Sequence, residues 1–141
     1  MFKTILAANV IWFGLGFHLF GLRSKVFAKI LVPPQHRDSP VFDTLIATGP
    51  FLAGFNFAFC VLSALLLFNA AAFPTATQRV ILLSVFALAH GSQFLGNVPV
   101  ALNNRQGEGV WQVAGLMRFI FITDFVLMMA NAALAVIYVW I

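Results

Sequence analysis

Residues 80–102 have the sequence VILLSVFALAHGSQFLGNVPVAL, and this stretch decides the class of fold. It contains 23 residues, and none of them is Lys, Arg, Asp or Glu. A helix of about 20 mostly apolar residues is long enough to cross a hydrocarbon core about 30 Å thick. Three more stretches of this kind occur, at residues 4–22, 51–68 and 119–140. The sequence therefore predicts four membrane-spanning helices.

The composition of the 141 residues excludes most other classes of protein. Apolar residues make up 62% and charged residues 9%, with a mean hydropathy of +0.98, whereas an average soluble domain is about 45–50% apolar and about 25% charged. These values exclude a soluble globular domain and a disordered segment, and the single cysteine, Cys60, excludes a disulfide-stapled module. The formal net charge is +4, but the basic residues are scattered between apolar runs, so a nucleic-acid binder is excluded too. We expect residues 1–141 to form a single membrane domain.

Short connections between the four stretches predict how the helices are arranged. Helices joined by short loops pack against their neighbours in opposite directions, so we expect an all-α integral membrane protein with an antiparallel four-transmembrane-helix bundle. Thr48 and Pro50 suit the first turn of the second span, while Thr75 and Thr77 are candidates to cap the third. Residues 24–31 carry apolar side chains on one helical face and lysines on the other. This pattern predicts a short amphipathic helix in the membrane interface, between the first and second spans.

The distribution of Lys and Arg predicts the orientation in the membrane, because cytoplasmic loops carry an excess of basic residues. Residues 23–50 and 103–118 contain six of the eight Lys and Arg, whereas Lys3 and Arg79 lie on the opposite side. We therefore expect the connections 23–50 and 103–118 to face the cytoplasm and both termini to lie on the other side. The membrane that we expect is a bacterial inner membrane.

Polar side chains inside the spans are the strongest indication of a site. An ionisable group at the centre of a bilayer costs about 2.5–3.5 kcal/mol on insertion scales, so it needs a reason to be there. The polar residues of the spans, and of the entrance to the fourth, include His18, Asn56, His90, Gln93, Asn97, Arg118, Asp124 and Asn131. Nearly all of them fall in the cytoplasmic leaflet at a rise of about 1.5 Å per residue, and those of the third span share one helical face. We therefore expect a polar pocket inside the bundle on the cytoplasmic side.

Two explanations of these residues remain open, helix packing and a site. Membrane helices are held together by hydrogen bonds between Ser, Asn, Gln and His side chains. The candidates for this structural role are Asn56, Cys60, Ser63 and Asn131. Asn9 lies nearly opposite His18 around the first helix and close to its far end, so we expect it to have a local role only.

Asp124 needs a more specific explanation. Inside a membrane a carboxyl group stays protonated, pairs with a cation or faces a water-filled cavity. Its candidate partners are Arg118, His18 and His90, and the two pairs with histidine are the first to test. A structural His–Asp bridge and a functional site both account for such a pair.

Four chemistries fit this set of residues to different degrees. Haem between His18 and His90 is disfavoured because the expected depths of the two differ by about 7 Å, and a metal on His18, His90 and Asp124 lacks the spacing of a ligand motif. Proton transfer on a lipophilic substrate makes these same three residues the candidate catalytic residues, with histidine as the base and aspartate orienting it. A binding pocket for a quinone, an isoprenoid or a lipid headgroup is favoured over the other three. Its candidate binding residues are Asn56, Gln93, Asn97 and Arg118.

The chain also resembles a known family. The first span is rich in glycine (Gly14, Gly16, Gly21), the second opens with GPFLAG at residues 49–54, and the third ends in the polar patch 90–97 before a glycine-containing loop and an aliphatic fourth span. This pattern is similar to that of the DoxX-like group of small four-span membrane proteins. Such proteins often carry an arginine near the end of the third span, where this chain has HGSQ at residues 90–93, so no catalytic residue is carried over. The resemblance implies a small subunit or partner of a membrane-associated redox system, often one linked to quinone.

Together these observations predict an integral membrane protein that binds a lipophilic ligand in a polar pocket of the cytoplasmic leaflet. We expect it to act as an accessory or binding subunit of a membrane redox or lipid system. The alternative is a membrane enzyme of the isomerase or oxidoreductase type that uses a His/Asp pair for proton transfer. The expected partners are the lipid bilayer, a lipophilic small molecule such as a quinone, and either further copies of the chain or another subunit of a membrane complex.

Overall fold

The computed structural model describes residues 1–140, which form helices and connecting turns without any β-strand. Four of the helices are long and apolar enough to cross a membrane. They are α1 (Phe2–Phe17), which the π-helical turn η1 (His18–Leu22) extends, α3 (Pro40–Phe68), α4 (Ala76–Arg105) and α5 (Gly115–Trp140). The prediction of an all-α protein with four helices long and apolar enough to span a membrane is confirmed.

Three short helical elements occupy the connections, namely α2 (Ser24–Leu31), η2 (Pro34–His36) and η3 (Ala70–Ala72). α2 is amphipathic, as its sequence predicts, and it buries Phe27, Ala28 and Leu31 against the rest of the chain. The turn that follows α2 is held by Arg37, which donates to the carbonyl oxygens of Val32 and Lys29, each over 2.8 Å. This part of the connection is therefore ordered by its own backbone contacts.

The second spanning helix, α3, begins at Pro40 rather than at residue 51, so the expected loop of residues 23–50 is largely helical. Pro40 occupies the first turn, where a proline removes no hydrogen bond. Pro50 lies inside the helix, and membrane helices tolerate this because neighbouring groups satisfy the backbone that proline leaves unpaired. Thr48 and Pro50 are thus interior residues and do not mark the start of the helix.

The third spanning helix, α4, begins at a capping box, as the sequence predicts for Thr75. The backbone N–H of Gln78 donates to Thr75 Oγ1 over 3.3 Å, and the backbone N–H of Thr75 donates to Gln78 Oε1 over 3.2 Å. These two bonds satisfy donors that the first turn of a helix otherwise leaves free.

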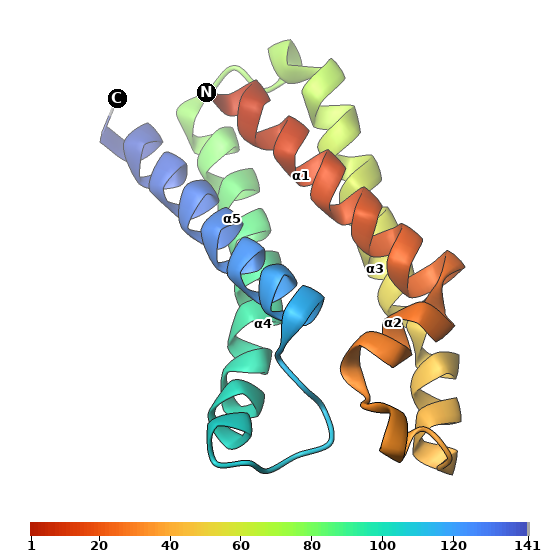
Figure 1. Cartoon of the computed structure of the whole chain (residues 1–141). Helices are drawn as coiled ribbons and strands as arrows, with labels where there is room; N and C mark the ends of the chain where they lie inside the picture. The colour runs from red at the N-terminus through yellow and green to blue at the C-terminus, as the bar shows by residue number, and fades with distance from the viewer. Residues whose placement is uncertain (141) are drawn as a thin grey trace.

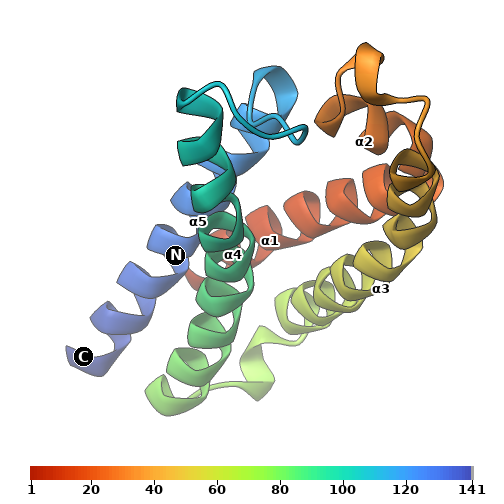
Figure 2. The same cartoon turned by 90° about the horizontal axis from the view of Figure 1, so that it is seen from below.

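The four long helices form two pairs, α1 with α3 and α4 with α5 (Figure 1). Small residues let the backbones of the first pair approach closely, as is common between membrane helices. A Cβ atom added at Gly16 would collide with the amide of Asn56, and one added at Gly21 would lie 2.8 Å from the Cβ atom of Ala53. The pairs touch each other much less, mainly where α1 crosses α5 (Figure 2).

Two apolar clusters hold the pairs together. The first lies toward the end of the molecule where both termini are drawn in Figure 1, and its buried members include Phe2, Leu6, Phe13, Leu83, Phe86 and Leu134. The second joins α2 to the start of α5 through Phe27, Leu31, Phe42 and Met117. The space between these clusters is the part of the interior that the pairs leave least filled.

Candidate functional site

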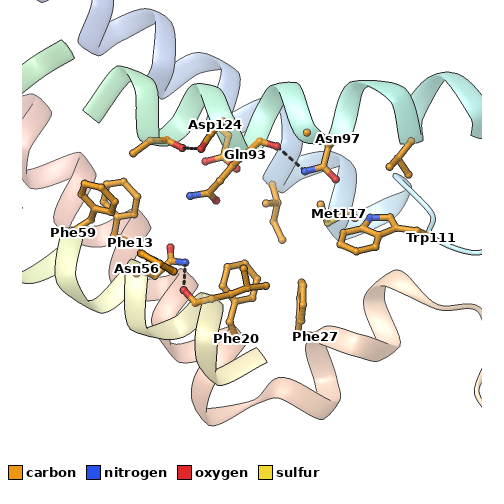
Figure 3. A pocket seen from close by; sticks show the side chains of 17 residues that line it. Phe13, Phe20, Phe27, Asn56, Phe59, Gln93, Asn97, Trp111, Met117 and Asp124 are labelled. Carbon is orange, nitrogen blue, oxygen red and sulfur yellow. Dashed lines mark hydrogen bonds between the residues drawn. The ribbon is translucent and has the colours of Figure 1, made fainter. Parts of the chain in front are cut away.

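A cavity of about 500 Å³ lies between the two helix pairs (Figure 3). Its walls come from both pairs, from α2 and from the connection between α4 and α5. Most of the wall is apolar, and six of its residues are aromatic, namely Phe13, Phe20, Phe27, Phe55, Phe59 and Trp111. Four of the polar residues predicted for the site also line it, namely Asn56, Gln93, Asn97 and Asp124. The cavity therefore combines an apolar surface with a small number of polar groups, which is the usual make-up of a ligand site.

A second, smaller cavity of about 220 Å³ adjoins the first on the side of α1 and α5. Both cavities are lined by Asn56 and Gln93, so these two residues lie at the boundary between them. His18 lines the smaller cavity and is exposed. Trp12 forms another part of its wall.

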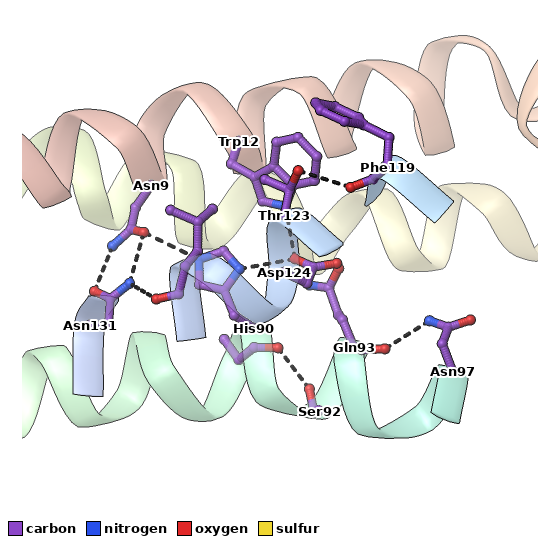
Figure 4. A network of polar contacts seen from close by, with 12 residues as sticks. Asn9, Trp12, His90, Ser92, Gln93, Asn97, Phe119, Thr123, Asp124 and Asn131 are labelled. Carbon is purple, nitrogen blue, oxygen red and sulfur yellow. Dashed lines mark hydrogen bonds and ion pairs between the residues drawn. The ribbon is translucent and has the colours of Figure 1, made fainter. Parts of the chain in front are cut away.

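A buried polar network adjoins the large cavity at Asp124 (Figure 4). His90 is fully buried and Asp124 is 1% exposed, and His90 Nδ1 lies 3.1 Å from Asp124 Oδ1. The same carboxylate oxygen accepts a hydrogen bond of 2.8 Å from Trp12 Nε1. Asp124 is thus held from two helices, by α4 through His90 and by α1 through Trp12.

The network continues from His90 to two asparagines. His90 Nε2 lies 3.2 Å from Asn9 Oδ1. Asn9 and Asn131 exchange hydrogen bonds, with Asn9 Nδ2 donating over 3.1 Å and Asn131 Nδ2 donating over 3.2 Å. Phe13 stacks on the imidazole of His90 with ring centroids 4.6 Å apart. Three helices that are far apart in the sequence, α1, α4 and α5, are therefore joined by side-chain hydrogen bonds in the interior.

These contacts limit what His90 can do. Both of its ring nitrogens have partners, so neither is free to ligate an iron or a metal ion. Within the part of the chain that the structure describes, no group of three or more His, Cys, Asp or Glu side chains is placed to hold a metal. Asp124, unlike His90, lines the large cavity, so it is the member of the pair that a ligand there meets.

The predicted site residues fall into three groups. Of the two histidine pairs proposed for Asp124, the structure contains the one with His90. Asn56, Gln93 and Asn97 line the large cavity, where the Nδ2 group of Asn56 donates to the carbonyl of Leu52 and that of Asn97 to the carbonyl of Gln93. His18 lines the smaller cavity together with Asn56 and Gln93 but is not paired with Asp124, and Arg118 is brought together with none of the others. His18 is exposed at the smaller cavity, and Arg118 is exposed at the start of α5 and lines neither cavity.

Two residues of the network were not predicted as part of the site, Asn9 and Trp12. Asn9 is fully buried and bonds to both Asn131 and His90, so the expectation of a merely local role was wrong. The sequence does contain an indication of this contact. Asn9 lies early in the first span and Asn131 late in the fourth, which places the two at a similar depth if both termini lie on one side. Trp12 follows Asn9 by three residues and therefore shares its helical face.

The residues expected to hold the bundle together behave differently from one another. Asn131 bonds between helices, and Cys60 Sγ lies 3.4 Å from the carbonyl oxygen of Val10 on the neighbouring helix. The Oγ atom of Ser63 and the Nε1 atom of Trp111 are buried and have no hydrogen-bond partner among residues 1–140. Trp111 lines the large cavity with its ring, while its N–H is buried.

Comparison with known proteins adds no family to these observations. No protein-family profile matches the chain, and no curated protein and no solved structure matches it.

Proposed function

We propose that this chain is an integral membrane protein that binds a lipophilic ligand with a small polar head in the large cavity. The observation that carries the proposal is the cavity of about 500 Å³ between the helix pairs, with aromatic walls and Asp124, Gln93 and Asn97 among its polar groups. Pockets for small molecules typically measure about 300–1,000 Å³ and combine mostly apolar walls with few polar groups. The cavity lies between helices that are long and apolar enough to cross a membrane, so a ligand dissolved in the membrane, such as a quinone, an isoprenoid or a lipid, suits it.

The proposal includes a placement in the membrane. We propose an antiparallel bundle in which both termini lie on one side and α2 lies in the opposite interface. Six of the eight Lys and Arg belong to residues 23–50 and 103–118, which supports a cytoplasmic position for that side in a bacterial inner membrane. The exposed lysines of α2 suit the anionic headgroups of that leaflet. The cavity then lies toward the cytoplasmic leaflet.

The resemblance to DoxX-like proteins supports a role as an accessory or binding subunit of a membrane redox or lipid system. Such a role needs either further copies of this chain or a different membrane subunit as a partner. Many large apolar side chains on the spanning helices are exposed, including Phe51, Phe55 and Leu88, and these suit lipid or a neighbouring helix equally well.

A second candidate function is favoured by the position of Asp124 between His90 and the cavity. A buried His–Asp pair beside a ligand is suited to proton transfer, as in an isomerase or an oxidoreductase. The contacts favour Asp124 as the group that exchanges a proton with the substrate and His90 as its positioning partner, which reverses the roles expected from the sequence. His18 would then act only on a substrate that also occupies the smaller cavity.

Filling the cavity with a side chain tests the binding function. Gly96 lines the cavity, and a Cβ atom added there meets nothing within 4 Å, so Gly96→Phe places a ring in the cavity without touching the polar network. Gly54 is the matched control, because it also has open space around it but lines neither cavity. After purification in mild detergent, native mass spectrometry should show a lipophilic molecule bound to the wild type and to Gly54→Phe, and lost from Gly96→Phe. Equal occupancy in all three proteins would refute the proposal.

A further inference from the structure

We infer that the head of the ligand donates a hydrogen bond to Asp124 Oδ2 and carries no negative charge, as the hydroxyl group of a long-chain alcohol or of a hydroquinone does. The inference rests on the proposed function, because it states which kind of head the large cavity accepts. It follows from the direction of the hydrogen bonds in the buried network, which one backbone carbonyl determines (Figure 4).

The direction begins at Leu127. Its carbonyl oxygen can only accept a hydrogen bond, and Asn131 Nδ2 donates to it over 2.8 Å. This contact orients the amide of Asn131, so that its Oδ1 faces Asn9 and accepts from Asn9 Nδ2. The amide of Asn9 is oriented in turn, and its Oδ1 faces both Asn131 Nδ2 and His90 Nε2. If the oxygen and nitrogen atoms of both amides were exchanged, Asn131 Oδ1 would face the carbonyl oxygen of Leu127, and two acceptors would lie against each other.

The amide of Asn9 determines the proton positions on His90. Because Asn9 Oδ1 is an acceptor, His90 Nε2 must carry a hydrogen. His90 Nδ1 faces Asp124 Oδ1 over 3.1 Å, and a proton must lie between these two atoms, since two lone pairs would repel each other. The proton resides either on the imidazole, as an ion pair, or on Oδ1, as a neutral pair. The total charge of the pair is zero in both cases.

Asp124 Oδ2 is therefore an acceptor whichever atom holds that proton. Oδ1 already contacts His90 and Trp12. Oδ2 carries no hydrogen in either arrangement, and no described residue donates to it. Oδ2 is not among the fully buried atoms that lack a partner, so it keeps access to the cavity. A ligand that fills the cavity removes this access, and a head that supplies a hydrogen avoids the cost of a buried acceptor without a donor. Asp124 lines the large cavity, so the missing donor is one that a ligand there supplies.

The charges around the cavity exclude an anionic head. None of the residues found to line the large cavity is Lys, Arg or His. Arg118, the cation expected to bind the ligand, lies outside it, and His18 belongs to the smaller cavity. A phosphate or carboxylate head would be buried beside Asp124 without a cation, which is strongly unfavourable in an apolar site. A neutral head that donates a hydrogen bond therefore suits the cavity.

Probes with one tail and different heads test the inference. The full chain in dodecyl maltoside micelles is titrated with farnesol, farnesyl methyl ether and farnesyl phosphate, and separately with dodecylhydroquinone and dodecylbenzoquinone. Binding is followed by tryptophan fluorescence, since Trp111 lines the cavity, and the apparent Kd is expressed as a mole fraction in the micelle. Each titration is repeated on Gly96→Phe and on the control Gly54→Phe.

We expect a hydroxyl-bearing probe to bind at least about tenfold more tightly than the partner without a hydroxyl, a difference typical of one lost hydrogen bond that leaves a buried acceptor unpaired. Gly96→Phe should abolish this binding and Gly54→Phe should preserve it. The series with the larger ratio identifies the source of the hydroxyl, an alcohol or a hydroquinone. If neither hydroxyl-bearing probe binds more tightly than its partner without a hydroxyl, or if farnesyl phosphate binds as tightly as farnesol, and Gly96→Phe abolishes that binding, the inference is overturned while the proposed function stands. If no probe binds, or if Gly96→Phe leaves binding unchanged, it is the proposed function that fails.

Discussion

Replacing Asn9 with alanine removes three hydrogen bonds that join α1 to α4 and α5. Two of them connect Asn9 to Asn131 and the third connects it to His90. Side-chain hydrogen bonds between membrane helices contribute about 0.6 kcal/mol each on average, so the bonds alone account for a loss of about 2 kcal/mol. The substitution also leaves Asn131 Oδ1 and His90 Nε2 buried without a partner, and each unpaired group costs about 1–3 kcal/mol in other proteins. The lost bonds set the lower end of the expected effect and the two unpaired groups set its upper end, so we expect Asn9→Ala to lower the free energy of unfolding by about 2–6 kcal/mol.

The measurement is reversible unfolding in mixed micelles, by titration with sodium dodecyl sulfate and detection by tryptophan fluorescence. Asn69→Ala is the matched control, because Asn69 is exposed and bonds only to the Leu65 carbonyl of its own helix. A double-mutant cycle with Asn131→Ala isolates the two bonds that these asparagines share, and we expect a coupling of about 1 kcal/mol. If Asn9→Ala costs no more than Asn69→Ala, or if the cycle shows no coupling, the network does not exist in the form described.

Three further predictions follow from single contacts. Trp12→Phe removes the donor to Asp124 Oδ1 and keeps an aromatic ring, so it should lower the free energy of unfolding by about 1 kcal/mol. The control Trp140→Phe changes an exposed residue and should have little effect. Equal effects of the two substitutions would contradict the contact between Trp12 and Asp124. Gly16→Val should cost about 1–3 kcal/mol in the same titration, because its side chain collides with Asn56, whereas Gly54→Val enters open space and should be tolerated. Asn104→Ala removes the contacts of the Asn104 side chain with Glu108, Trp111 and Val113. It should speed amide hydrogen exchange in residues 106–114, while exchange in the interior of α4 and α5 stays slow. Unchanged exchange in residues 106–114 would show that another contact orders this connection.

Most of the fold could be predicted because the lengths of apolar runs reflect the thickness of the membrane. The spans at residues 80–102 and 119–140 lie within α4 and α5, and Thr75 caps α4 as expected. The start of α3 could not be predicted, because Pro50 is as compatible with a first turn as with the interior of a membrane helix. Such a proline is informative only when the contacts of the preceding residues are known.

The site could be predicted less completely, for a physical reason. Helical spacing shows which residues of one helix share a face, and it correctly groups His90, Gln93 and Asn97 on the inner side of α4. It does not show how two helices are rotated and shifted against each other. That relation decides why Asp124 meets His90 and not His18, and why Asn9, which lies opposite His18 on α1, faces the network. Trp12 was overlooked because an indole in a membrane span needs no explanation until its N–H is buried.

The uneven packing of the four helices has a mechanical consequence. Glycines bring α1 into close contact with α3, and α4 packs extensively against α5, so the contacts within each pair far exceed those between the pairs. Each pair is therefore one packing unit. Between the units, the interlocking side chains are concentrated in the two apolar clusters and the polar network. A small change in the spacing of the units therefore disturbs few close-packed atoms, and widening the gap between them requires much less work than separating either pair. For the proposed function, this predicts that an elongated ligand dissolved in the surrounding lipid enters sideways between the two pairs.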